Sequence, residues 1–164
     1  IHNSKPVIAE INGVATAAGC QLVASCDLAY ASDISKFATP GVNIGLFCST
    51  PMVALSRVVK NKHAMEMLLT GDFINADKAK SIGLINNSFK EQELFNEINL
   101  IANKLSKKST LTLKIGKKAF YNQSEMKITD AYKYASEVMI KNMMEKDSEE
   151  GIRAFIEKRK PNWN

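Results

Sequence analysis

The chain has 164 residues, of which 45% are hydrophobic and 24% are charged, and its formal net charge is +5. This length and balance are typical of a globular protein with one sizeable core. No apolar run approaches the roughly 20 residues needed to span a bilayer, and no signal-peptide pattern opens the chain. A membrane-embedded protein is therefore excluded, and we expect no membrane partner.

The three cysteines, Cys20, Cys26 and Cys48, form neither a CxxC pair nor a disulfide framework. Their odd number and their apolar or small-residue surroundings predict reduced, mostly buried thiols in an intracellular protein. The two histidines, His2 and His63, lack ligand-like spacing to these cysteines, so we expect no metal site.

The positive charge is concentrated in two places, the stretch between Glu97 and Glu125 and the cluster at 158–160. Solvated helix faces are the interpretation that we favour. The alternative is attraction of an anionic ligand, either a phosphate-bearing cofactor or a nucleic acid, and charge alone does not separate these two. The first stretch contains no acid and six lysines: Lys104, Lys107, Lys108, Lys114, Lys117 and Lys118.

Taken in order, the chain opens on residues 1–6, which look like the middle of a domain and not like a natural beginning. Val7–Asn12 is predicted to be a buried strand, followed by a small-residue loop. A short helix is predicted over Ala18–Ser25 and a second strand over Leu28–Ala31. Because strand, helix and strand follow one another so closely, we expect α/β packing.

Proline and glycine punctuate the next part of the chain. Pro40–Pro51 is predicted to be a long loop, of the kind on which functional residues often lie. The other elements expected here are a short strand at 37–39, helices beginning near Thr50 and covering 61–70 and 76–82, and a short strand at 84–85.

From Leu94 onward the periodicity is helical, with helices predicted over 94–105, 111–121, 129–147 and 147–156. Asp147 and Glu150 have the spacing of a capping box for the last of these. The methionine-rich faces are expected to pack against the core or against a copy of the protein. We place a coarse boundary between a mixed α/β part, 1–105, and a helical part, 106–164.

The small-residue stretch Asn12–Leu22 is the feature around which we expect the site to be built. A helix that begins near Ala18 presents unpaired N–H groups and the positive end of its dipole. The side chains are small enough for another group to approach the backbone, which suits the binding of an oxyanion. The alternative, which the pattern alone favours, is close packing of helix and strand through glycine and alanine.

An ordered set of motifs covers most of the chain: residues 5–13, 18–22, 26–31, 37–40, 64–71, 79–85 and 150–161. Through them the chain resembles crotonase-fold proteins, the enoyl-CoA hydratase/isomerase superfamily. It looks closest to the enoyl-CoA hydratase domain-containing subgroup, which lacks the catalytic glutamates. The resemblance implies an α/β fold: the C-terminal part of a crotonase-type ββα spiral core, followed by a helical trimerisation region.

The resemblance also implies a coenzyme A thioester as substrate or ligand, with no tightly bound cofactor. It implies a homotrimer or a dimer of trimers, and it leaves a mitochondrial or cytoplasmic location undecided. In the family, the half of the fold that precedes these motifs supplies a second oxyanion donor and much of the surface that contacts coenzyme A.

The implied site residues follow from the motif positions. Ala18 matches a backbone N–H donor of the oxyanion hole. Phe155 and Lys158 match positions that help to hold the adenine and phosphate end of coenzyme A from a neighbouring subunit, although a core Phe and a surface Lys explain them equally well. Gln21 and Gly41 match the family's two catalytic glutamates. A glutamine cannot act as a general base, and a glycine offers no side chain.

Three hypotheses remain open on this sequence. The first is an enzyme of acyl-CoA metabolism, a lyase or isomerase that stabilises an enolate. The second is a non-catalytic acyl-CoA-binding or scaffold protein. The third and weakest is nucleic-acid binding through the lysine-rich stretch. Cys48, Ser49 and Thr50 could line the site, but none has a recognisable base partner.

Overall fold

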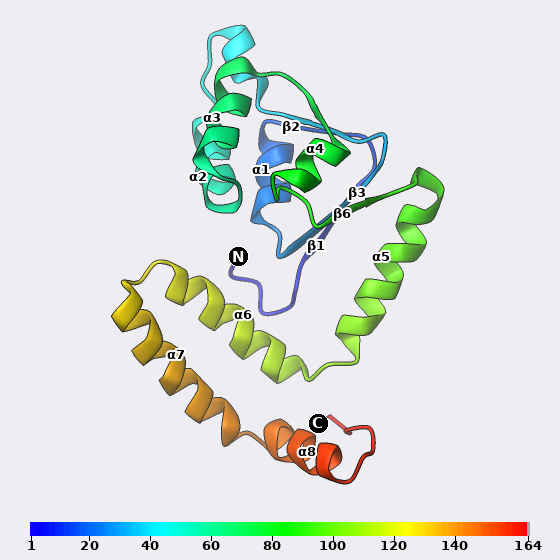
Figure 1. Ribbon diagram of the computed structural model, residues 1–164, viewed down its shortest axis with the longest axis vertical. Coiled ribbons are helices and arrows are strands. Elements are labelled where there is room, and N and C mark those ends of the chain that lie inside the picture. The colour runs from blue at the N-terminus through cyan, green and yellow to red at the C-terminus, as the bar shows by residue number, and fades with distance from the viewer. Residues whose placement is uncertain (164) are drawn as a thin grey trace. The chain divides into compact units, whose positions relative to one another are not determined.

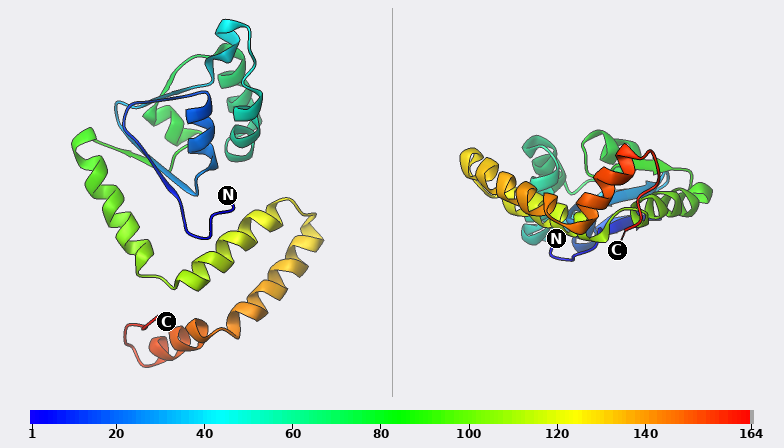
Figure 2. Two further views of the ribbon diagram at one scale, coloured as in Figure 1. Left: turned by 180° about the vertical axis from the view of Figure 1, so that it is seen from behind. Right: turned by 90° about the horizontal axis from the view of Figure 1, so that it is seen from below.

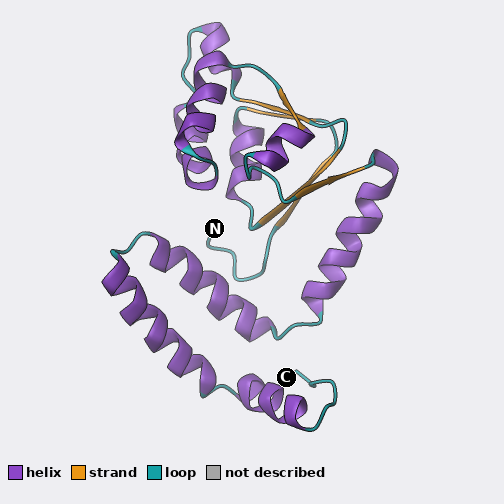
Figure 3. Ribbon diagram, in the orientation of Figure 1, coloured by secondary structure: helices purple, strands orange, loops and turns teal. Residues whose placement is uncertain are grey.

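The computed structural model describes residues 1–163. The chain divides into two compact units, which are described separately. One unit is Val7–Ala102, and the other combines Ile1–Pro6 with the chain from Asn103 onward. The described strands all lie in the first unit, whereas the regular structure of the second unit is helical (Figure 3).

The first unit contains two three-stranded sheets, ordered β1-β3-β6 and β2-β4-β5 (Figure 1). Strand β3 pairs in parallel with both β1 and β6, and β2 pairs in parallel with β4. Only β5, among the described strands, runs antiparallel to its neighbour β4. The strands are β1 (Ile8–Ile11), β2 (Val14–Thr16), β3 (Leu28–Ser32), β4 (Lys36–Ala38), β5 (Ile74–Asn75) and β6 (Asn87–Phe89).

Two strands in a row and then a helix make the repeating element of this unit. β1 and β2 enter different sheets, α1 (Ala18–Ser25) follows, and β3 and β4 return to the same two sheets in the same order. The buried Ser35 hydroxyl fixes the corner, donating to the Ile11 carbonyl at 2.9 Å and accepting from the Gly13 N–H at 3.1 Å. The chain therefore stacks one ββ turn upon the next.

Helix α1 packs against β2 and against α2 (Ser49–Val58). Along the chain, the 3₁₀ helix η1 (Pro40–Ile44) precedes α2, and α3 (Asn61–Thr70) and α4 (Ala76–Ser81) follow it. The largest fully buried side chains are Phe37, Leu55, Met67, Leu68 and Leu94, with the smaller Thr39, Cys20, Ser32 and Ser35.

Three helices make up most of the second unit: α6 (Thr110–Ser124), α7 (Ile128–Met143) and α8 (Lys146–Ile156). Helix α5 (Glu91–Ser106) begins in the first unit and ends in the second. Helices α6 and α7 pack side by side, with Asn122 donating to the Tyr134 hydroxyl at 3.0 Å (Figure 2). Ser109 caps α6 and also donates to the Asp147 carboxylate of α8.

Several local predictions were wrong. Val14–Thr16 forms β2, where a loop was expected, because its backbone pairs with β4. Leu84 and Ile85 are buried but belong to a turn, and the strand is β6, two residues later. Asp147 and Glu150 lie inside α8 and do not form a capping box, since the helix is preceded by Glu145 without a side-chain cap.

Within residues 1–163, none of the helices combines the length and the hydropathy of a membrane-spanning segment.

Candidate functional site

Helix α1 begins at Ala18, directly after a strained turn at Ala17. Ala17 precedes the helix with φ 46° and ψ −113°, a conformation that costs a non-glycine residue on the order of 1–3 kcal/mol. Two hydrogen bonds hold it there, from the Ala17 N–H to the Ala38 carbonyl and from the Gln21 N–H to the Ala17 carbonyl, both at 3.0 Å. Ala18 is exposed, and its N–H meets no acceptor within the described part of the chain.

Gly19 is not required by the packing of this helix. A Cβ built on it would come no closer than 3.9 Å to another atom, the Ala15 Cβ, and its backbone does not need a positive φ. Close packing through glycine, the alternative that the sequence pattern favoured, therefore does not explain this residue. By contrast, Gly13 has φ 122°, which a residue with a side chain rarely adopts.

Gln21 lies one turn into the same helix, where it is half-buried. Its side-chain amide forms no hydrogen bond with any of residues 1–163. An amide can donate and accept hydrogen bonds, so Gln21 can orient a water or a polar ligand group, but it cannot take up a proton as a base.

Gly41 sits in a tightly folded segment with no space for a side chain. A Cβ on Gly41 would lie 2.5 Å from the Leu46 carbonyl oxygen and 2.9 Å from the Cys48 sulfur. The segment closes on itself, because the Leu46 N–H donates to the Gly41 carbonyl at 2.9 Å and the Gly41 N–H points at the Cys48 sulfur at 3.4 Å. The predicted loop is thus a 3₁₀ helix followed by a compact turn that replaces any residue 41 side chain with Cys48.

The two buried thiols of this region are Cys20 on α1 and Cys48 at the start of α2. Burial, with a smaller contribution from Cys48, raises the pKa of Cys20 to about 11. A thiol with this pKa stays protonated near neutral pH and is a poor nucleophile. The Ser49 hydroxyl donates to the Phe47 carbonyl at 3.3 Å and is paired with no basic side chain among residues 1–163.

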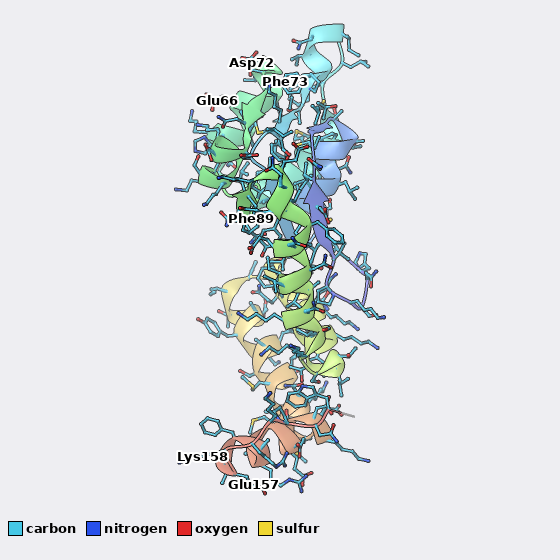
Figure 4. The ribbon with its side chains drawn as sticks, turned by 90° about the vertical axis from the view of Figure 1, so that its right-hand side faces the viewer. Glu66, Asp72, Phe73, Phe89, Glu157 and Lys158 are labelled. Atoms are coloured by element: carbon cyan, nitrogen blue, oxygen red, sulfur yellow. The ribbon has the colours of Figure 1, made fainter. Side chains whose placement is uncertain are left out.

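The remaining predicted residues, Phe155 and Lys158, belong to the second unit. Phe155 is on α8 with 84% of its surface exposed, which is incompatible with the alternative of a core Phe in this chain. Lys158 lies in the turn that ends α8, next to Glu157 (Figure 4). It has φ 53° and is exposed.

Three lysines of the basic stretch, Lys114, Lys117 and Lys118, come together on one face of α6. They border a cavity of about 280 Å³, together with Tyr121, Asn122 and residues 1–4. The Lys117 ammonium donates to the Lys5 carbonyl at 3.0 Å. These three lysines thus border a concave part of the surface.

A network around Glu150 is the feature that the sequence did not reveal. The carboxylate is nearly buried and accepts from Arg153, from Arg159 and from the Asn162 backbone. The Arg159 hydrogen bonds, then those from Arg153, hold the pKa of Glu150 well below its usual range. Since Arg159 is nine residues from Glu150, no helical spacing predicted this pair. Among the described residues, no three His, Cys, Asp or Glu side chains gather as a metal ion would require.

Comparison with known proteins identifies relatives of this chain. Enoyl-CoA hydratase domain-containing protein 3, mitochondrial, of Xenopus laevis is 57% identical over 158 residues, which cover 96% of this chain and 54% of that protein. The Homo sapiens protein of the same name is 52% identical over 159 residues, covering 97% and 52%. The crotonyl-CoA hydratase of Syntrophomonas wolfei is 36% identical over 162 residues, covering 97% and 62%. The chain thus spans about half the length of the first two relatives.

Solved structures show the same fold. An enoyl-CoA hydratase of Mycobacterium smegmatis matches with a TM-score of 0.97 and 49% identity, over 99% of this chain and 63% of that chain. The human enoyl coenzyme A hydratase domain-containing protein 3 matches with a TM-score of 0.96 and 52% identity, over 99% and 64%. The predicted crotonase-type α/β fold with a helical C-terminal region is confirmed, as is the predicted subgroup.

The profile of the enoyl-CoA hydratase/isomerase family matches residues 1–164. The chain belongs to that family.

Proposed function

We propose that this chain binds an acyl-CoA thioester and holds its carbonyl oxygen through the backbone N–H of Ala18. The observation that carries the proposal is the backbone N–H of the exposed Ala18, which no described residue accepts and which follows the strained turn at Ala17. Strain of this kind persists where the surrounding structure enforces it, and it is concentrated at functional sites. The small side chains on either side leave the backbone accessible. At Gly19 the packing would tolerate a Cβ, so the fold itself does not explain why a glycine is present.

The chemistry that suits this geometry is stabilisation of an enolate. An N–H group at a helix N-terminus becomes a stronger partner as negative charge develops on the thioester oxygen. This is the electrostatic part of hydration and isomerisation of enoyl-CoA, the reactions after which the family is named. No resident cofactor is needed for it, and the coenzyme A thioester is itself the ligand.

The same residues favour a binding protein without classical hydratase activity as the second candidate. Gln21 cannot exchange protons, and at Gly41 the space for a carboxylate is taken by the Cys48 sulfur and the Leu46 carbonyl. Both general acid–base positions are therefore lost, the second one sterically. We infer that binding is retained and that water addition through two carboxylates is not.

An assembly of several copies is part of the proposal. Helix α7 leaves large apolar side chains uncovered, with Met139, Ile140 and Met143 each more than half exposed. A homotrimer or a dimer of trimers would cover such faces and bring Phe155 and Lys158 of one subunit to the ligand of its neighbour. By analogy with relatives named as mitochondrial proteins, we propose a mitochondrial location.

The test is the substitution Ala18→Pro in the full-length protein. Proline removes the N–H, which no described residue uses, but its ring also disfavours the backbone conformation of Ala17, so the Tm of the variant is measured beside its affinity. Affinity for crotonyl-CoA is expected to fall roughly tenfold, and any turnover by about a hundred- to a thousand-fold. Ala18→Ser, which keeps the N–H, serves as the control with near wild-type values. Equal affinity of wild type and Ala18→Pro would remove the proposed role of this donor.

A hydration assay separates the two candidates. We expect wild-type protein to bind crotonyl-CoA in a calorimetric titration without hydrating it at a rate above background. Robust hydration would overturn the non-catalytic candidate, and absence of binding to any coenzyme A ester would overturn both.

A further inference from the structure

The chain that follows α8 is folded back onto the Glu150 carboxylate. Arg159 donates to both of its oxygens, at 2.6 and 2.9 Å, and Arg153 donates to one of them at 2.8 Å. The Asn162 N–H donates to it as well, at 2.9 Å. A bidentate arginine–carboxylate pair adds geometric specificity as well as strength to an ion pair. The four hydrogen bonds therefore define one geometry for residues 159–162.

This fold-back encloses a turn in which Lys158 has an unfavourable backbone conformation. The Lys158 N–H donates to the Phe155 carbonyl at 3.2 Å, and the Arg159 N–H donates to the Ala154 carbonyl at 3.0 Å. These two bonds make a Schellman motif, in which the left-handed position is usually glycine. Here it is Lys158, with φ 53°. Nothing in the turn itself explains why a lysine is present.

Trp163 holds the segment that follows the turn through a second contact. The Trp163 indole N–H donates to the Lys107 carbonyl at 2.8 Å. The Trp163 ring lies over Gly151, where a Cβ would be 3.4 Å from it. The position of Lys158 is thus set by both ends of the segment that contains it, which is how a strained residue can be maintained.

The Lys158 side chain is free to bind a ligand. It is exposed, and its ammonium forms no ion pair or hydrogen bond with residues 1–163. Phe155 lies three residues earlier, with 84% of its surface exposed. A cation whose backbone is held in place, three residues after an exposed aromatic side chain, suits a ligand that carries both a phosphate and a purine base.

We propose that Glu150, acting through Arg159, is a positioning residue that fixes Lys158 to receive a phosphate group of the coenzyme A ligand. The proposal rests on the proposed function, since it assigns a device to the nucleotide end of the same ligand. It predicts that the fold-back matters for the nucleotide part of the ligand and not for the thioester.

The experiment compares crotonyl-CoA with crotonyl-pantetheine, which has the same thioester but neither phosphates nor adenosine. Calorimetric affinities are measured for the wild type, Lys158→Met, Glu150→Gln, and the variant that combines the two substitutions. Lys158→Met is expected to reduce the preference for crotonyl-CoA roughly tenfold, as the loss of one charge-assisted contact does. Glu150→Gln is expected to reduce it at least threefold, with the affinity for crotonyl-pantetheine unchanged.

The combined variant is decisive. If Glu150 acts through Lys158, the preference of the combined variant equals that of Lys158→Met alone. Additive losses, or an equal loss of affinity for both ligands in Glu150→Gln, would overturn the proposal and leave Glu150 a merely structural role. If Glu150→Gln does not fold, Arg159→Lys, which keeps the charge but not the bidentate pair, takes its place in the same comparison. If the wild type binds neither ester, the proposed function is wrong, and the positioning role of Glu150 fails with it.

Lys158→Gly gives an independent readout. It relieves the strained turn and is expected to raise the Tm while lowering the preference for crotonyl-CoA as Lys158→Met does. A Tm that falls would contradict the claim that the turn tolerates lysine for the sake of a ligand.

Discussion

Replacing Gly41 with alanine is expected to destabilise the protein by about 1–3 kcal/mol, because the added methyl group overpacks a closed turn. The Cβ would lie 2.5 Å from the Leu46 carbonyl oxygen and 2.9 Å from the Cys48 sulfur, whereas ordinary contacts begin at 3.4 Å. The sulfur can move with its side chain, but the carbonyl oxygen is backbone. It is also held in place, because the Leu46 N–H donates to the Gly41 carbonyl at 2.9 Å.

The assay is urea denaturation of the full-length protein followed by circular dichroism, with Gly116→Ala as the matched control. Gly116 lies inside α6 with no atom within 4 Å of its Cβ position, so the same change there should stabilise by about 0.5–1 kcal/mol. Opposite signs for the two variants would support the structure of the turn. A Gly41→Ala variant as stable as the wild type would refute the reasoning, since it would mean that the turn opens at no cost.

Restoration of hydratase activity is expected to fail for the same reason. Combining Gln21→Glu with Gly41→Glu would introduce a carboxylate at both positions. The residue 41 side chain, however, has no space while the turn keeps its conformation. Crotonyl-CoA hydration should remain at background in this variant. Activity well above background would show that the turn rearranges around a carboxylate.

The remaining predictions concern packing and pH. Gly19→Ala should stabilise the protein against denaturation by about 0.5–1 kcal/mol, because the new Cβ meets only the Ala15 methyl group, at 3.9 Å. It should also weaken acyl-CoA binding, because residue 19 is next to the Ala18 donor. Unchanged affinity would show that no ligand approaches there. Stability should fall as the pH rises from 9.0 towards about 11, by about 2–3 kcal/mol for Cys20, because the unfolded thiol ionises while the buried one stays protonated; Cys20→Ala should show a correspondingly smaller slope. Stability from Glu150 should be present above about pH 4.5 and be lost as the pH falls, since folding lowers its pKa; the Tm difference between wild type and Glu150→Gln should therefore shrink between pH 7 and pH 3.5.

Much of the fold could be predicted from the sequence because local signals agreed with the tertiary structure. Gly71 has φ 67° directly after α3, which matches the helix predicted over 61–70. The Asn75 side chain accepts from the Lys78 N–H at the start of α4, near where the helix over 76–82 was predicted to begin. The failures arose where pairing with a distant strand decided the outcome. Val14–Thr16 is strand only because β4 lies beside it, and Leu84 and Ile85 are apolar because they are buried in a turn.

The candidate site was less predictable than the fold. Residue identity located Ala18 and showed that Gln21 and Gly41 carry no carboxylate. It could not show that Ala17 adopts a positive φ, since alanine has no preference for that conformation. Nor could it reveal the Glu150–Arg159 pair, which depends on a turn that begins with a lysine where glycine would be expected.

The arrangement around Gly41 decides whether a carboxylate could be placed at this position. A carboxylate replaced by a smaller residue ordinarily leaves a space that water or a new side chain can fill. Here the turn has closed, so that the Cys48 sulfur and the Leu46 carbonyl occupy the position of a side chain at residue 41. A single substitution would therefore not restore a catalytic acid, because the backbone of the turn would have to move as well. At α1 the opposite holds, since the Ala17–Ala38 hydrogen bond keeps a strained turn, and the Ala18 N–H that follows it has no acceptor among residues 1–163. A chain under no demand to bind a ligand would gain stability by relaxing that turn, which is why we assign it the function of binding an acyl thioester.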